Sequence, residues 1–527
     1  MQVPPGQGRH PEALRWGWMN RVLVLCEGGL SLPLEEKPMN QQAMDKYRSL
    51  HGLPELAGVA TFAGAAGPGI GVQECVDRLK CFHYALQRTW QVLLTRIACE
   101  PIYELKMGYS YHAHLVAEHI TLLRDRVAEL RHPPLRLHRV PDQNLQALFD
   151  EIRNAPDCGM VMEGLYRVAL PALRESMKEY SNDTNPLTDA PSLRILRVIL
   201  PELEEMIGWG EASCKALEEA ISDPHEDLQE WREELKGWLA AAGGLAATRE
   251  PVAAPNPRYS SEEFVYDSTP KRDERFPDPY NMGVHAEEFL HDSSFESRDK
   301  VFMMFFKRLR EIDVPEMMAS ILYETVTGKG EEEGSKRPWG FYRDMTRQLW
   351  DEARHAMMGE VGFARSGVNW PATVRVNSTW SKGLNQQLTP RERHAVLWFI
   401  EQGLMSKTGK RFEWELGTDS GDAFSELIQD FDWADEVLHA RIGREWYVKD
   451  FETTEAAAEY GNACWNKVVS EWEKWKEEGL TEHHNWWPDL YREVCKNRGE
   501  DPDPRVVAYD RSYAETRADL QKIDSDS

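Results

Sequence analysis

Apolar residues recur at helical spacing along most of the chain, whereas β-branched residues rarely alternate with polar ones. An apolar stripe with a period near 3.6 residues predicts an amphipathic helix, and strict alternation would predict a strand. We therefore expect an all-α protein. Long helices are predicted within residues 74–130, with a break near Met107-Gly108, and further helices over 160–181 and 191–240.

The composition changes between residues 241 and 281, where Gly-Gly, several Pro and few apolar residues occur. Such a stretch is typical of a linker. Helical patterns return beyond it, over residues 299–327, 338–363, 390–406 and 422–449. Four amphipathic segments in succession predict a four-helix bundle.

A chain of 527 residues is too long for one hydrophobic core, so more than one domain is expected. We predict a helical N-terminal domain over residues 1–240, the linker over 241–281 and a bundle domain over 282–460. A Trp-rich helix and a polar tail should fill residues 461–527.

Acidic residues outnumber basic ones by 88 to 62, and the net charge is −26. Nucleic acids and anionic membranes attract clustered Lys and Arg, so neither is an expected partner. No apolar run approaches the ~20 residues that cross a bilayer, and Val22–Leu25 is too short for a signal-peptide core. The eight Cys residues form no CxxC pair, which suits a reducing compartment. We expect a cytoplasmic protein.

Two nine-residue stretches of the second half repeat one another: DEARHAMMG begins at Asp351, and DEVLHARIG begins at Asp435. Each contains a Glu followed three residues later by a His, namely Glu352 with His355 and Glu436 with His439. Side chains at i and i+3 lie on one face of a helix, so each pair could bind one metal ion.

Both pairs lie on the apolar stripes of their helices, for example in line with Phe341 and Leu349. They should therefore point into the bundle, where an unpaired charge is very costly and a metal cation would compensate it. Gly359 and Gly443 follow each His by one turn, and we expect the missing side chains to leave room beside the site.

A dinuclear site also needs one Glu from each of the other two helices. Glu401 lies on the inward stripe of the third helix and precedes Glu436 by 35 residues. Glu316 precedes Glu352 by 36 residues and is the expected ligand of the first helix, although it could instead cap that helix. Glu324 is the alternative, about 12 Å further along the axis.

The order Glu, Glu-x-x-His, Glu, Glu-x-x-His resembles the ferritin-like di-iron carboxylate superfamily, over residues 299–449. The sequence from Asp351 to His355 is also similar to the Asp/Glu-Glu-x-Arg-His form of its oxygen-activating members. The resemblance implies outer roles for Asp351, Arg354 and Asp435, with the two aspartates hydrogen-bonded to the metal-bound imidazoles. The second motif departs from the form, because Leu438 stands where Arg is usual.

The resemblance implies a centre of two iron ions, with manganese or an iron–manganese pair also suited to these ligands. It implies an oxidoreductase that activates O2 to oxidise a small organic substrate. A separate electron donor would be needed, because no flavin, iron–sulfur or nicotinamide motif occurs. The alternative is a non-catalytic protein that binds metal or serves as a scaffold. An RNA-modifying hydroxylase is disfavoured by the negative charge.

The first half contains a cluster of its own on one predicted helix, consisting of His112, His114, Glu118 and His119. It has no second Glu-x-x-His, so these are expected to be surface histidines, and a mononuclear metal site is the alternative. The N-terminal domain could be a divergent bundle without metal, or could form a homodimer with another copy. The substrate pocket is expected near Trp350, Trp398 and Trp446.

Overall fold

The computed structural model describes residues 47–130, 135–220, 228–255, 260, 262–328, 337–468 and 472–513. Three predicted features lie outside these ranges: the short apolar stretch Val22–Leu25, most of the loop after Gly328, and the end of the polar tail. All regular elements within them are helices, which confirms the predicted all-α class. Contacts divide the chain into Met1–Ala63, where the described residues form only short helical turns, and the compact unit Gly64–Ser527.

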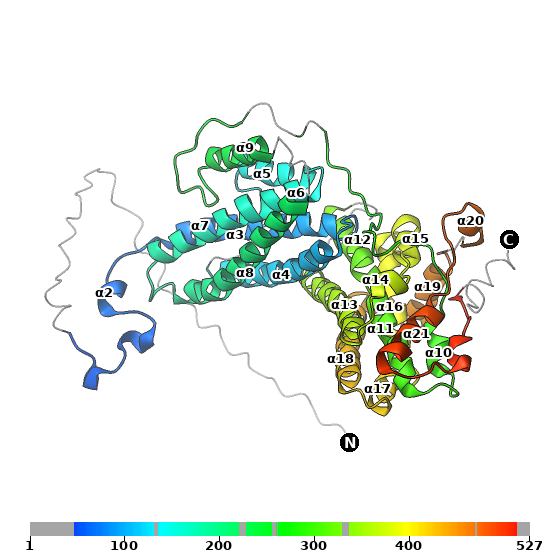
Figure 1. Ribbon diagram of the computed structural model, residues 1–527. Helices are drawn as coiled ribbons and strands as arrows, with labels where there is room; N and C mark the ends of the chain where they lie inside the picture. Colours follow the sequence, from blue (N-terminus) through cyan, green and yellow to red (C-terminus); the bar gives the residue numbers. More distant parts are fainter. Residues whose placement is uncertain are drawn as a thin grey trace, which may run out of the picture. The chain divides into compact units, whose positions relative to one another are not determined.

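Four long helices of the first half form a bundle, in which each packs against two of the others (Figure 1). They are α3 (Val72–Ile97), α4 (Tyr103–Leu130), α7 (Leu170–Asp183) and α8 (Ala190–Ala220). The shorter helices α5 (Gln143–Asn154), α6 (Cys158–Met162) and α9 (Leu228–Ala241) pack beside them, and a π-helical turn, Glu163–Ala169, leads into α7. Met107-Gly108 lies inside α4, so the predicted break there is wrong; the break falls between Ile97 and Tyr103.

The second half also contains a bundle, in which α12, α13, α18 and α16 pack against one another in a closed ring. The helices of the ring are α12 (Asp313–Thr327), α13 (Trp339–Arg365), α16 (Pro390–Leu404) and α18 (Ala423–Trp446). A fifth helix, α11 (Ser297–Arg310), packs against α13. The remaining helices surround it: α10 (Ala286–His291), α14 (Trp370–Thr373), α15 (Thr379–Gln387), α17 (Lys410–Asp419), α19 (Thr454–Trp465), α20 (Trp472–Glu477), α21 (Trp487–Arg498) and α22 (Pro504–Val507).

The segment predicted as one helix over 299–327 is two helices, with a turn at Glu311-Ile312. Pro315 explains the break, because a proline ring clashes with the carbonyl group four residues earlier, which here belongs to Glu311. Within the first turn of α12 the same proline is tolerated, since the N–H that it lacks would have no partner there. The break turns Glu311 into an interior position of the second bundle.

Two glycines let neighbouring helices approach α13 and α18 closely. A Cβ atom on Gly359 would lie 2.4 Å from the backbone of Leu309 and of Phe305 in α11, and one on Gly443 would lie 2.2 Å from Trp398 in α16. The prediction that these glycines leave room beside the site is therefore wrong, because the neighbouring helices fill the space.

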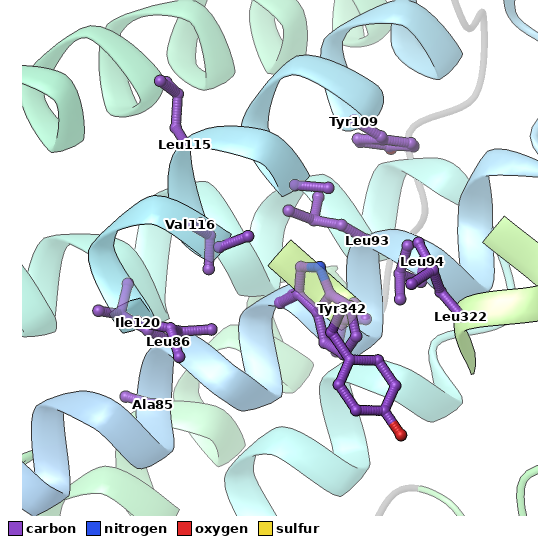
Figure 2. Packing of buried hydrophobic residues seen from close by; sticks show 14 of the residues in the cluster. Ala85, Leu86, Leu93, Leu94, Tyr109, Leu115, Val116, Ile120, Leu322 and Tyr342 are labelled. Carbon is purple, nitrogen blue, oxygen red and sulfur yellow. The ribbon is translucent and has the colours of Figure 1, made fainter. Parts of the chain in front are cut away.

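The two bundles share a hydrophobic core, since α4 packs against α13 and α3 against α12. Figure 2 shows Leu93 and Leu94 of α3 near Leu322 of α12 and Tyr342 of α13. The indole N–H of Trp90 also donates to the Thr346 hydroxyl at 3.1 Å. The bundles are therefore in direct contact, although the predicted domain boundaries themselves stay a prediction.

Each helix of the described ranges is too short or too polar to cross a bilayer.

Candidate metal centre

The two repeated nine-residue stretches, which begin at Asp351 and Asp435, place their four ligand candidates in the interior of the second bundle. Glu352 and His355 project from α13, Glu436 and His439 project from α18, and all four are buried. The centres of the two imidazole rings lie 6.0 Å apart. The local reasoning from i, i+3 spacing therefore places these side chains correctly.

Two groups of acidic and histidine side chains have ligand atoms within 4.8 Å of one another. The first contains Glu311, Glu352, His355 and Glu436, and the second contains Glu352, Glu401, Glu436 and His439. Glu352 and Glu436 belong to both groups, as expected of carboxylates that lie between two metal positions. The structure thus brings together five of the six predicted ligands in a buried cluster that could bind metal and is compatible with a di-iron site.

Glu316 is the exception, and Glu311 takes the place predicted for it. The Glu316 carboxylate is fully buried, but it pairs with the ammonium group of Lys106 and lies 3.0 Å from Nη2 of Arg272. The alternative, Glu324, pairs with Arg393 at 2.8 Å. Glu316 lies away from the cluster because the chain does not form the one continuous helix predicted over 299–327, and the turn at Glu311 changes which side chain faces the site.

Each imidazole turns Nδ1 toward the carboxylates of the centre. His439 Nδ1 lies 3.1 Å from Glu352 Oε1 and 3.3 Å from Glu436 Oε2. His355 Nδ1 lies 3.3 Å from Glu311 Oε2. Nδ1 is therefore the ring nitrogen available to a metal ion in both residues.

The side chain of each outer aspartate reaches the histidine on the opposite helix. Asp435 of α18 lies 3.1 Å from Nε2 of His355 on α13, and Asp351 of α13 lies 3.5 Å from Nε2 of His439 on α18. A carboxylate at Nε2 holds the proton there and leaves the lone pair on Nδ1. Arg354 links the two aspartates, with Nη2 at 2.7 Å from Asp351 and 2.5 Å from Asp435. One arginine thus serves both motifs, which explains why Leu438 can stand at the second arginine position.

Sequence reasoning missed three further charged residues in the cluster. Lys410 Nζ lies 2.8 Å from Glu436 Oε1 and 3.0 Å from Asp432 Oδ1, and Arg308 pairs with Asp432 as well. Asp432 could have been found, because it precedes Glu436 by one helical turn and shares its face. Lys410 could not, since it lies in the predicted loop 406–421, where the structure has α17.

Negative charge is in excess at the centre. Glu311, Glu352, Glu401, Asp432 and Glu436 supply five carboxylates, whereas Arg308 and Lys410 supply two cations. Among the described residues, buried Glu401 Oε2 has no hydrogen-bond partner. Acidic side chains therefore outnumber basic ones here, and protons or metal ions must supply the remaining positive charge.

The pKa values reflect this excess. Burial raises the pKa of Glu401 well above its ordinary value, and the neighbouring Glu436 raises it further. Burial by itself would lower the pKa of His439, but the neighbouring carboxylates of Asp351, Glu352 and Glu436 raise that pKa well above its ordinary value. Both shifts favour the protonated forms in the absence of metal, and bound metal ions would compete with these protons. Carboxylate oxygens and imidazole nitrogens are ligands that suit iron and manganese.

A cavity of about 390 Å³ opens onto the cluster and reaches Glu311, Glu352, Glu401 and Glu436. Much of its wall is apolar, formed by Val314, Met317, Trp380, Leu384, Leu397, Ile400, Leu404 and Trp465. Trp350, Trp398 and Trp446, near which the substrate pocket is expected, do not line this cavity. Trp350 packs on Tyr111, with ring centres 4.7 Å apart, and the Trp446 indole donates to Asp344.

The histidines of the first half do not form a comparable site. His112 is buried, and its Nδ1 lies 2.7 Å from the Tyr166 hydroxyl. His119 is also buried and lies 2.5 Å from Glu202. The prediction of surface histidines is wrong for these two residues, which are partnered core side chains. Within the described ranges, both groups able to hold metal belong to the second half.

Comparisons with protein-family models, with curated proteins and with solved structures found no match to this chain.

Proposed function

We propose that the chain is a non-haem di-iron oxidoreductase, related to the ferritin-like di-iron carboxylate proteins, that activates O2 to oxidise a small organic substrate. The observation that carries the proposal is the pair of four-ligand groups that share Glu352 and Glu436. An iron–manganese or dimanganese centre would use the same ligands. When bound in its reduced state, the metal pair would supply the electrons that O2 activation requires.

In this proposal Glu311 and His355 would help to hold one ion and Glu401 and His439 the other, while Glu352 and Glu436 could serve either ion. Asp351 and Asp435 keep the Nε2 protons in place, so that each Nδ1 presents its lone pair. The amide group of Gln348 donates to Glu401 Oε1 at 3.1 Å and orients that carboxylate. These contacts hold the ligands in place before any metal binds.

The cavity supports a substrate whose reacting part is apolar. Its wall beside the carboxylates is formed largely by aliphatic and indole side chains, which exclude water from the reacting group. The basic side chains that it also contains already have acidic partners; Arg310, for example, lies 3.4 Å from Glu287. A hydrocarbon or aromatic group therefore suits the cavity better than an anionic one.

Elemental analysis of protein purified from iron- and manganese-supplemented cells tests the proposal. We expect about two equivalents of metal per chain, and loss of metal in Glu352→Ala and His439→Ala. Glu445→Ala is the matched control, because Glu445 is exposed on the same helix as His439. Substrate screening by O2 consumption would follow. Metal content that is unaffected by both site substitutions would refute the proposal.

A non-catalytic role is the second candidate, and one observation favours it. Lys410 and Arg308 already neutralise part of the cluster, as in a buried polar network that serves only the fold. In that case the metal-free protein would show the same thermal stability before and after iron is added, and no O2 would be consumed.

A further inference from the structure

We infer that the two metal positions are unequal, because the ammonium group of Lys410 occupies part of the Glu311–His355 position. One ion binds first at Glu401 and His439, and a second ion binds only when Lys410 withdraws from Glu311 and Glu436. This inference rests on the proposed function, and it concerns the order and affinity with which the centre is filled.

The contacts of Lys410 are concentrated on one side of the cluster. Its Nζ atom lies 2.8 Å from Glu436 Oε1, 3.0 Å from Asp432 Oδ1 and 3.3 Å from Glu311 Oε1. An ammonium group has three N–H donors, and here three carboxylates surround it. Glu311 belongs only to the first metal-binding group, and the shared Glu436 turns Oε1 to the lysine and Oε2 to His439 Nδ1, at 3.3 Å. An ion at the first position must therefore compete with the lysine for both carboxylates.

Arg308 reinforces the asymmetry. Its Nη2 atom lies 3.0 Å from Glu311 Oε1, and its guanidinium group also pairs with Asp432. On the other side of the cluster, no Lys or Arg among the described residues forms an ion pair with Glu352 or Glu401. The protein therefore supplies its own positive charge at one metal position and leaves the other position to a metal ion.

The fold holds Lys410 in this place. It is the first residue of α17, its side chain is 1 % exposed, and α17 packs against both α11 and α18. Gly409 precedes it where a Cβ atom would lie 2.1 Å from the Leu404 carbonyl oxygen, so the chain turns tightly into the helix. A cation at a helix N-terminus is unfavourable by itself, so the three carboxylates must account for its position.

Asp432 can remain the partner of the Lys410 ammonium group after that group leaves Glu311 and Glu436. It belongs to neither metal-binding group, yet it contacts both Lys410 and Arg308. If a second ion takes Glu311 and Glu436, the ammonium group can keep its contact with Asp432. Release of Lys410 from the two ligands then costs part of its ion pairing and not all of it.

Titration of the metal-free full-length protein with Mn²⁺, followed by electron paramagnetic resonance, tests the inference. In the parent we expect the first equivalent to give the spectrum of isolated Mn²⁺. The second should bind at least about tenfold more weakly, the effect of breaking one charge-assisted hydrogen bond. Lys410→Met should bring the two affinities together, so that spin-coupled pairs form at lower loading than in the parent. Lys407→Met is the control, because Lys407 is exposed in the same segment.

Two equal affinities in the parent would overturn the inference while leaving the proposed function standing. This result needs only the parent protein, so the test does not depend on whether Lys410→Met folds. Failure of both parent and variant to bind Mn²⁺ or Fe²⁺ would overturn the proposed function together with the inference.

Discussion

Gly359→Ala tests how tightly α11 is held against the helix that carries Glu352 and His355. The added Cβ atom would lie 2.4 Å from the Leu309 amide nitrogen and 2.4 Å from the Phe305 carbonyl oxygen. Both neighbours are backbone atoms, so no side chain can rotate away. The helix α11 must move outward, and it carries Arg308 and leads directly into Glu311.

The magnitude follows from two opposing effects. Overpacking a well-packed core costs up to about 3 kcal/mol, and contact with backbone places this substitution at the upper end. Replacing Gly by Ala inside a helix stabilises that helix by about 1 kcal/mol. The net expectation is a loss of about 2 kcal/mol in the free energy of unfolding. Gly208→Ala in α8 is the matched control, since no atom lies within 4 Å of its added Cβ, and it should stabilise the protein by about 0.5–1 kcal/mol.

Chemical denaturation of the parent and both variants, with metal analysis of each, measures the two effects. Gly359→Ala should unfold at lower denaturant concentration than the parent and should lose metal, whereas Gly208→Ala should keep its metal and unfold later. Equal stability of Gly359→Ala and Gly208→Ala would refute the close approach of α11 and α13, and with it the placement of Glu311.

Three further predictions address the outer aspartate, the reassigned glutamate and a core histidine. Asp435→Asn removes the carboxylate at Nε2 of His355, and titration should show metal affinity lower by about 10- to 100-fold; unchanged affinity would refute the role of Asp435. Glu316→Gln leaves Lys106 and Arg272 without their shared carboxylate and should cost about 3–5 kcal/mol of stability, yet metal analysis should find the parent's metal content; loss of one equivalent would restore Glu316 as a ligand. Burial lowers the pKa of His112 to about 3, so the unfolded chain takes up its proton near pH 6.5 while the folded chain does not. Stability should therefore fall with decreasing pH below 6.5, by about 2 kcal/mol for this residue at pH 5. Between pH 6.5 and pH 5, the free energy of unfolding should fall less in His112→Asn than in the parent, as measured by denaturation at each pH. An equal fall in the two proteins would contradict the lowered pKa of His112.

Helical periodicity was sufficient to predict the all-α class and the place of Glu352, His355, Glu436 and His439. These predictions depend on spacing within a single helix, where residues three apart share a face whatever the rest of the chain does. Glu401 was predictable for the same reason, since it continues the inward stripe of α16. The sequence by itself therefore determined which helix faces carry the candidate ligands.

The tertiary structure decided everything that joins one helix to another. Glu311 lies at the cluster in place of Glu316 because the turn before Pro315 changes which side chains face the bundle interior. The Glu316 carboxylate pairs instead with the buried Lys106 of the first half. Lys410 reaches Glu436 only because α17 packs beside α18. Contacts of this kind join residues far apart in the sequence, and their partners are set by the packing of whole helices, which no local pattern of apolar and polar residues specifies.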